Sequence, residues 1–400
     1  MASLSDNHPT RATGKREEKR LRKRNLFLRL VRKYPGISRQ ACARMMEVST
    51  FSISRLTRSL IDAGVVVEDT DLEPVNPLPQ GRPSTPLRLN PEYGYFAGID
   101  VEAAQWRMVV IDFAGNPVFD RRKPLRPCDD REAYRQQLAH LLRECMTECG
   151  VLWEKVESLG VGVPGLLDLE RGIVENYEPL PNFDSIPVMD ICHEVTDLPV
   201  TLLNNVASLA VYDVWKRPAA EEQIALHVVV RSGIGSALLR YGQRFAGSHS
   251  HGGELGHFPL SRDSGGETVT LEMVAGLSAL REQVPAETPH ALWEGASAAV
   301  EHALEHPGVH ALLSEAMTAL GRTLAGVAAL LDPDQIIVHS PLFSEENELW
   351  RLLVHEYEAD LSPLVAHHVT FRRSEVPSHA PAVGAALQGL ELLYPANRQV

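Results

Sequence analysis

The chain has 400 residues, 44% of them hydrophobic and 23% charged, which suits a soluble globular protein of two or three domains. The sequence contains no run of about 18 apolar residues and no apolar signal segment near its start, so a membrane span and secretion are disfavoured and a cytoplasmic location is expected. Charge is segregated: residues 1–60 hold 15 Lys and Arg against 4 Asp and Glu, a net charge of +11, whereas the other 340 residues hold 24 against 48, a net charge of −24. A basic segment of this kind raises the encounter rate with a polyanion such as nucleic acid.

The basic segment has the pattern of a helix-turn-helix. A first helix is predicted from Lys15 to Tyr34, where apolar residues alternate with Arg and Lys. A second helix is predicted after Ser38 as its N-cap, and a third after Ser49, ending at a left-handed Gly64. The outer face of the third helix carries short hydroxyls and arginines, which suit close approach to phosphates and base edges in a DNA major groove. Its candidate DNA-binding residues are Ser49, Thr50, Ser52, Ser54, Arg55 and Arg58.

Two predicted strands, 65–67 and 86–89, flank a proline-rich segment and together indicate a wing. Arg82 lies in the stretch Gln80-Gly81-Arg82-Pro83, and an arginine in such an extended frame can enter a narrow minor groove. Arg82 is therefore a further candidate DNA-binding residue. A linker that happens to contain one arginine explains the stretch equally well.

The acidic body alternates glycine-punctuated strands with helices. The segment YFAGIDVEAAQWRMVVID predicts a hairpin that ends at Asp112, and SLGVGVPGLLD, VTLLNNVASLA and HVVVRSGIGSALLRYG add further strands and turns. This order predicts an α/β fold of two lobes with a cleft between them. The C-terminal stretch HAPAVGAALQGLELL is predicted to be a helix that returns to the first lobe.

The fixed order of these motifs resembles the ROK family (repressors, open reading frames and sugar kinases), in its transcriptional-regulator branch. The resemblance covers roughly residues 20–390 and rests on the GRPS wing, GIDVEAAQWRMVVID, GVGVPGLLD, NNVASLA, RSGIGSALLRYGQRFAG, GGELGH and DPDQIIVHSPL. It implies a winged helix-turn-helix followed by a two-lobed actin-like (ribonuclease H-like) sugar kinase fold. It also implies a sugar in the cleft and a homodimer or homotetramer that binds a palindromic operator. The expected domains are 1–90 for DNA binding, 91–215 with the helix 380–400 for the first lobe, and 216–379 for the second lobe.

Several positions depart from the pattern of the family kinases. Where those kinases have Asp-x-Gly, this chain has Asp100-Val101-Glu102, so a negative side chain replaces the glycine that would approach ATP. The second phosphate loop is partly kept as Ser232-Gly233-Ile234-Gly235-Ser236, but Arg231 precedes it where the family often has glycine. The family's Asn-Asp catalytic pair is Asn204-Asn205 here, and an amide cannot accept a proton near neutral pH. We therefore expect a site that binds its ligand and does not transfer phosphate.

The ligand-binding positions that the resemblance implies are Asn204, Asn205, Glu254, His257 and Glu272. Carboxylates, an imidazole and amides suit a polyol, whose hydroxyl groups both donate and accept hydrogen bonds. Taken singly, each residue has an ordinary structural interpretation as surface carboxylate, core histidine or turn. Their joint occurrence at the family's spacing favours binding.

No metal or other cofactor is expected. Many ROK proteins hold a structural zinc with the GH histidine and three cysteines, but the matching stretch FPLSRDSGGETVTLE has no cysteine, and His257 alone cannot complete a four-ligand site. The five cysteines of the chain are scattered without a CxxC pair, which favours reduced thiols. His249, His251 and His257 form a local cluster, for which a polar loop is favoured over a divalent-metal site.

The favoured interpretation is a sugar-responsive DNA-binding transcriptional regulator, expected to be a repressor, whose degenerate kinase cleft binds a carbohydrate without phosphorylating it. Its expected partners are a double-stranded DNA operator and a small sugar, with no membrane partner. One alternative is an ATP-dependent sugar kinase with a fused DNA-binding head. Another is a metal- or phosphosugar-responsive regulator that uses the His249/His251 loop.

Overall fold

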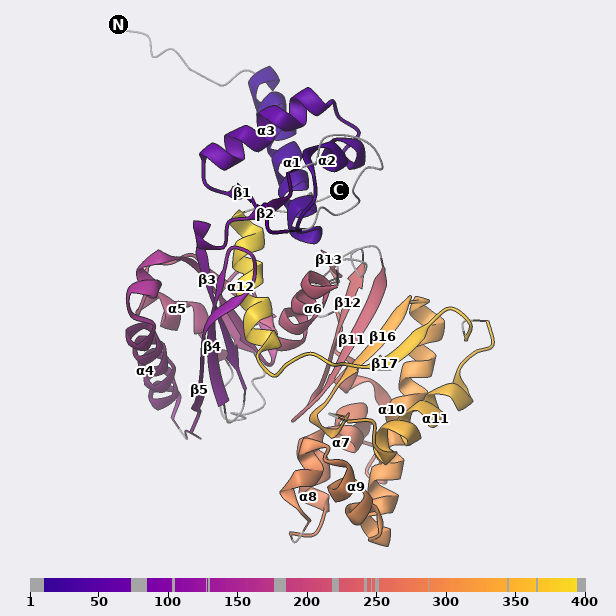
Figure 1. The fold of residues 1–400 in the computed structure, drawn as a ribbon. Coiled ribbons are helices and arrows are strands. Elements are labelled where there is room, and N and C mark those ends of the chain that lie inside the picture. Colours follow the sequence, from indigo (N-terminus) through magenta and orange to yellow (C-terminus); the bar gives the residue numbers. More distant parts are fainter. Residues whose placement is uncertain are drawn as a thin grey trace, which may run out of the picture.

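The structure is a computed structural model. It describes residues 11–72, 85–102, 105–126, 128, 130–175, 185–217, 223–240, 243–245, 247–248, 252–286, 288–343, 345–364 and 366–393. The helices are α1 (Arg11–Lys33), α2 (Arg39–Met45), α3 (Thr50–Asp62), α4 (Arg131–Cys149), α5 (Val188–His193), α6 (Asn205–Lys216), α7 (Leu271–Ala275), α8 (Leu277–Gln283), α9 (Ser297–Leu304), α10 (Pro307–Leu331), α11 (Glu348–Asp360) and α12 (Ala380–Leu393) (Figure 1).

The strands are β1 (Val66–Glu68), β2 (Leu87–Leu89), β3 (Tyr95–Val101), β4 (Gln105–Asp112), β5 (Pro117–Pro124), β6 (Val156–Val163), β7 (Leu166–Asp168), β8 (Ile173–Glu175), β9 (Ser185–Ile186), β10 (Val200–Asn204), β11 (Ile224–Val230), β12 (Ile234–Arg240), β13 (Gln243–Arg244), β14 (Pro259–Arg262), β15 (Thr268–Thr270), β16 (Gln335–His339) and β17 (Thr370–Arg373). Within the described part of the chain, every helix is too short or too polar to cross a bilayer.

The N-terminal head consists of α1, α2, α3 and the antiparallel pair β1–β2. The predicted N-caps are confirmed: the Ser38 hydroxyl accepts the Ala41 N–H, and the Ser49 hydroxyl accepts the Ser52 N–H. Gly64 follows α3 with a φ of 73°, as the predicted left-handed stop requires. The first helix starts at Arg11, four residues before the predicted start, and so includes Gly14, a residue that usually disfavours helix.

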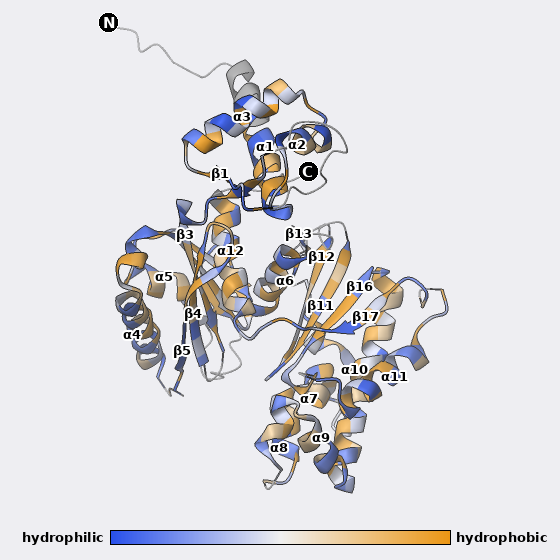
Figure 2. Ribbon diagram, viewed as in Figure 1, coloured by the Kyte–Doolittle hydropathy of each residue, from blue (hydrophilic) through white to orange (hydrophobic). Residues whose placement is uncertain are grey.

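The body contains two five-stranded sheets. The first has the strand order β10-β6-β3-β4-β5, and the predicted hairpin is present in it as β3 and β4. The second has the order β13-β12-β11-β16-β17, and α10 and α11 pack together beside it. Apolar residues fill the central strands β11 and β16 (Figure 2), as expected for strands covered on both faces.

Helices α6 and α12 lie between the two sheets and pack against each other (Figure 1). As predicted, the C-terminal helix α12 returns to the first sheet, where it contacts β3, β6 and β4. The approach is so close that a Cβ on Gly98 would collide with the Ala382 carbonyl oxygen, and a Cβ on Gly384 with that of Ser208. The packing of α12 therefore requires glycine at both positions.

The head docks on the first lobe through one continuous apolar cluster. Buried side chains of α1, such as Phe27 and Val31, share this cluster with Phe113 of the first lobe and with Leu387 and Leu390 of α12. The head is therefore packed on the body, and its position follows that of α12 and α6.

Candidate functional site

Helix α3 presents a polar outer face. Thr50, Ser54, Arg55 and Arg58 are exposed, whereas Ile53, Thr57 and Leu60 face the core. The other two hydroxyl residues of the predicted set, Ser49 and Ser52, bond to each other. Ser49 Oγ lies 3.3 Å from the backbone nitrogen of Ser52 and 3.1 Å from Ser52 Oγ. They hold the N-terminus of the helix in the conformation that presents the other four side chains.

One exposed residue of this face was missed by the sequence reasoning. Phe51, in the first turn of α3, is 77% exposed. The sequence offered no signal for it, because the predicted DNA-binding set was restricted to hydroxyl and arginine side chains. Arg82, the candidate for minor-groove contact, lies outside the described residues.

The interlobe site begins at the N-terminus of α6. The Asn204 side chain caps this helix: its Oδ1 accepts the Val206 N–H at 2.9 Å, and its Nδ2 donates to the Gly165 carbonyl at 3.2 Å. Asn205 Nδ2 donates to the carbonyl oxygen of Val101 at 3.0 Å, while Asn205 Oδ1 is buried without a hydrogen bond. The position that the family resemblance assigns to the catalytic base thus holds an amide that is hydrogen-bonded to the end of β3.

Two of the departures from the kinase pattern meet in space. Arg231, at the end of β11 in the second lobe, forms an ion pair with Glu102, which follows β3 in the first lobe. Both side chains are about one-third exposed, at 31% and 32%. The sequence shows each residue as a separate irregularity 129 positions apart, so their pairing was not predicted. The ion pair joins the two segments that correspond to the phosphate loops of the family kinases.

Asp100 lies beside this ion pair and is only 4% exposed. Burial, reinforced by the neighbouring Glu102 carboxylate, raises the pKa of Asp100 from 3.8 to about 8, against the opposing charge of Arg231. Its Oδ1 is buried without a hydrogen bond. The carboxyl group is therefore largely protonated at neutral pH.

Three loops of the second lobe are built around the start of β12. The Glu272 carboxylate, in the first turn of α7, accepts the Ile234 N–H at 2.5 Å. A Cβ on Gly256 would come within 2.8 Å of the same carboxylate, and the Ser236 N–H donates to the Gly253 carbonyl at 2.8 Å. A Cβ on Gly235 would lie 2.9 Å from Val206 of α6. These contacts link α7, the segment 253–257 and the N-terminus of α6 into one assembly.

The structure therefore brings the predicted ligand-binding residues onto connected elements, with different degrees of exposure. Glu254 and Glu272 are half-buried, which differs from a freely solvated surface position. His257, at the end of a 3-10 turn, is exposed and so is no core histidine. His249 and His251 lie outside the described residues, and the described part of the chain contains no group of three His, Cys, Asp or Glu that could hold a metal.

Comparison with known proteins identifies the body. The family model described as ROK family matches residues 96–389, which is most of the chain. The chain belongs to the ROK family. Among its ROK relatives, the xylose repressor of Caldicellulosiruptor bescii is 24% identical over 56% of this chain, and the match spans only 55% of that protein. The DNA-binding transcriptional repressor Mlc of Escherichia coli is 20% identical, with 90% of each chain covered.

Kinases occur among the relatives as well. The glucokinase of Halalkalibacterium halodurans is 22% identical over 72% of this chain and 93% of that protein. Among solved structures, a ROK family transcriptional regulator, described as a homologue of Escherichia coli Mlc, superposes with a TM-score of 0.75 at 21% identity. It covers 94% of this chain and 98% of that chain. The likeness confirms the predicted two-lobed ROK fold of the body, and the N-terminal helix-turn-helix is consistent with it.

Proposed function

We propose that this ROK protein is a sugar-responsive DNA-binding transcriptional regulator, acting as a repressor, whose interlobe site binds a carbohydrate without phosphorylating it. One observation carries the proposal: Asn205, at the position that the family resemblance assigns to the catalytic base, is an amide that donates its N–H to the Val101 carbonyl oxygen. Transfer to a sugar hydroxyl needs a group that accepts the hydroxyl proton, and an amide has no such capacity near neutral pH.

The phosphate side of the site supports the same conclusion. A family kinase brings glycine backbone close to the phosphates, whereas here the Glu102 carboxylate and the Arg231 guanidinium form an ion pair between the two loops. A nucleotide phosphate would have to displace Glu102 from Arg231 and would then face an uncompensated carboxylate. The pair therefore holds the loops together without a nucleotide.

The hydroxyl-binding groups are consistent with a polyol effector. Glu254, His257 and Glu272 come from two neighbouring segments of the second lobe, and Asn205 comes from the first turn of α6. The buried Oδ1 of Asn205 lacks a hydrogen bond, so a hydroxyl donor on the effector would satisfy it. Sugar binding would in this way use groups of both lobes.

DNA binding is assigned to the head. The exposed face of α3 would enter the major groove, with Thr50 and Ser54 near its N-terminus and Arg55 and Arg58 further along. Two symmetry-related copies would read a palindromic operator, because half-site symmetry mirrors the two-fold symmetry of a dimer. The net charge of +11 on residues 1–60 supplies the long-range attraction to the phosphates.

Helix α6 offers a route between the two sites. It starts at Asn205, and near its other end the ring of Trp215 lies 3.9 Å from the guanidinium carbon of Arg32 in α1. Arg32 also forms an ion pair with Glu391 of α12 at 2.6 Å. A shift of α6 on sugar binding would therefore act on α1, and through it on the spacing of the paired α3 helices.

The test is fluorescence-anisotropy titration of DNA from upstream of the protein's own gene, at fixed salt, with a panel of free pentoses and hexoses. We expect nanomolar binding that one sugar shifts by at least about tenfold, which corresponds to a coupling of about 1.4 kcal/mol. Tight binding that no sugar changes would contradict the sensor proposal and leave the DNA-binding assignment standing.

A second candidate, an ATP-dependent sugar kinase with a DNA-binding head, is favoured by the glucokinase among the relatives. An ATP-turnover assay with the same hexose panel separates the two. Turnover that depends on a hexose would establish the kinase, and none is expected because Asn205 cannot act as a base.

A further inference from the structure

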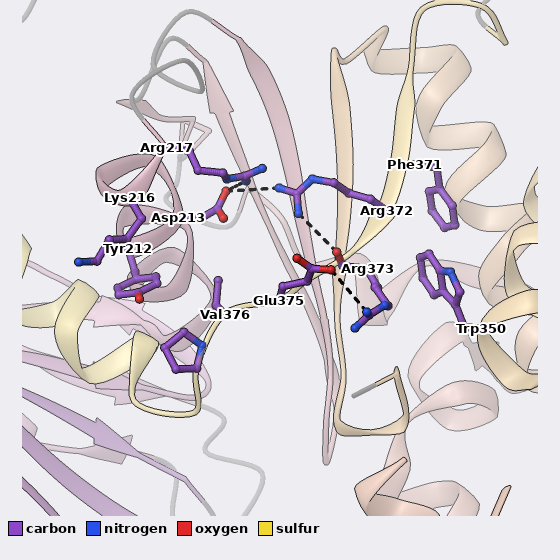
Figure 3. A pocket seen from close by; sticks show the side chains of 11 residues that line it. Tyr212, Asp213, Lys216, Arg217, Trp350, Phe371, Arg372, Arg373, Glu375 and Val376 are labelled. Atoms are coloured by element: carbon purple, nitrogen blue, oxygen red, sulfur yellow. Dashed lines mark hydrogen bonds and ion pairs between the residues drawn. The ribbon is translucent and has the colours of Figure 1, made fainter. Parts of the chain in front are cut away.

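A second hollow lies away from the interlobe site and shares no residue with it. It has a volume of about 570 Å³ and is formed by the last two turns of α6, by β17 and by the segment 375–377 (Figure 3). This volume is in the range of small-molecule sites in proteins. The walls belong to the two places where the chain passes between the lobes, since α6 leads from the first lobe to β11, and the segment 375–377 leads from β17 back to α12.

The charge of the hollow is opposite to that of the body around it. Residues 61–400 carry a net charge of −24, yet the hollow is lined by four cations, Lys216, Arg217, Arg372 and Arg373, and by only two carboxylates, Asp213 and Glu375. A concave surface with excess positive charge attracts anions and concentrates them.

The carboxylates do not neutralise the cations. The single negative charge of Asp213 is shared by two guanidinium groups, because Asp213 pairs with Arg217 and lies 3.7 Å from Arg372. Glu375 lies 3.4 Å from Arg373. Arg217 Nε and Arg372 Nη2 are both buried without a hydrogen bond, and Figure 3 shows both side chains converging on Asp213. Lys216, on the same helix, is exposed, but its ammonium lies over the ring of Tyr212, 6.0 Å from the ring centroid, and Figure 3 shows it directed away from Arg217 and Arg372.

The neighbouring groups leave this excess uncompensated. Desolvation, followed by the charge of Arg372, lowers the pKa of Arg217 to about 10, so the two guanidinium groups destabilise each other. Behind them, burial lowers the pKa of His227 to about 3 and that of His339 well below its usual range, so both imidazoles are neutral. An anion in the hollow beside Arg217 and Arg372 would relieve this repulsion.

The geometry points to a small organic phosphate as the ligand: we propose that the hollow binds a phosphate monoester of a metabolite at Arg217 and Arg372. Guanidinium groups bind phosphate oxygens in pairs, and a dianion matches the excess of two positive charges better than a single carboxylate does. The ring of Tyr212, on the same turn of α6, supplies an apolar wall for the organic part.

Such a ligand would add a second input to the regulator. The hollow and the ring contact to Arg32 use adjacent residues of α6, Lys216 and Trp215, so phosphate binding would act on the helix that contacts the head. The inference does not depend on the interlobe site being a sugar sensor, because no residue is common to the two.

The test is isothermal titration calorimetry on the full chain at fixed ionic strength, with glycerol 3-phosphate as the probe. Saturable binding with one site per chain is expected, whereas neutral glycerol should not bind. R372Q removes one of the two guanidinium groups and should weaken binding about tenfold, as the loss of a charge-assisted hydrogen bond implies. R217Q is the second variant, and circular dichroism shows whether each variant is folded.

Matched controls complete the design. R322Q removes an arginine that does not line the hollow and that pairs with Asp360 of α11, and N205A alters the interlobe site. Both should bind glycerol 3-phosphate as the unaltered chain does. No saturable binding at millimolar probe, equal weakening by R322Q, or citrate binding as tightly as glycerol 3-phosphate would overturn the phosphate assignment. Loss of binding in N205A would place the phosphate in the interlobe site and overturn it too.

Discussion

Asn205 illustrates how one side chain can fix what a site does. The variant N205D would restore the residue type that a kinase needs, but its carboxylate would face the Val101 carbonyl oxygen, 3.0 Å away from the present Nδ2, beside the acidic Asp100 and Glu102. We expect no sugar phosphorylation and a loss of about 1–3 kcal/mol in the free energy of unfolding, measured by urea denaturation.

N204D is the matched control, since it adds the same charge one residue earlier. Aspartate is a good N-cap, so this variant keeps the bond to the Val206 N–H and loses only the one to Gly165. Its loss of stability should be smaller than that of N205D. Hexose-dependent ATP turnover by N205D would show that the rest of the site is still competent for transfer.

Asp100 gives the protein a pH dependence that can be isolated. Its folded pKa is raised to about 8, so the folded state holds this proton more tightly than the unfolded chain does. The resulting stabilisation is complete below the unfolded pKa of about 4 and is lost as the pH rises through about 8. Between about pH 5 and pH 8.5 the melting temperature should therefore fall more for the unaltered chain than for D100N, measured by calorimetry.

D69N serves as the control for this experiment. The hydrogen bond from Arg88 lowers the pKa of Asp69, so any contribution of this residue is lost at acid pH and not between pH 5 and 8.5. D69N should therefore keep the slope of the unaltered chain over that range. A D100N slope equal to that of the unaltered chain would mean that Asp100 is already ionised at pH 5.

Helix α6 is the element on which three features converge. The interlobe site lies at its start, the basic hollow at its last two turns, and Trp215 meets Arg32 of the head. If α6 transmits the sugar signal, R32A should leave sugar affinity unchanged and reduce the effect of sugar on operator binding to less than about twofold, because it removes the contacts to Trp215 and Glu391. The readout is operator anisotropy with and without the active sugar.

R322A is the control for R32A. It also removes an arginine from an ion pair, but this pair, with Asp360 at 2.8 Å, joins α10 and α11 in the second lobe. It should retain the full sugar effect. An R32A protein that responds to sugar as strongly as R322A would exclude this contact as the route.

At the scale of the whole molecule, the sequence predicted those features of the fold that neighbouring residues determine. Helix caps at Ser38 and Ser49, the stop at Gly64 and the β3–β4 hairpin follow from residues within a few positions of each other. The order of motifs was sufficient for the two-lobed fold. Contacts between distant segments were not predictable. The residues next to Glu102 do not indicate that it pairs with Arg231, and those next to Arg217 do not indicate that Arg372 lies close to it. Phe51 is a further feature that the sequence did not predict, an apolar residue that is exposed.

The division of charge between head and body implies that the two binding functions can be separated by single substitutions. R55A removes one exposed cation from α3, and because the sugar site is in the acidic body, sugar affinity should not change. Operator binding should weaken by about 1–3 kcal/mol if Arg55 reads a base edge, with loss of selectivity at one position. If Arg55 contacts phosphate instead, the loss should be uniform across sequences and the salt dependence should fall by about one unit of slope.

R351A is the control, because it removes the same charge from α11. It should change neither the operator affinity nor the sugar affinity. Loss of sugar binding in R55A, measured by calorimetry, would contradict the separation, since it would require the head to contribute to a site that we propose to lie between the two lobes.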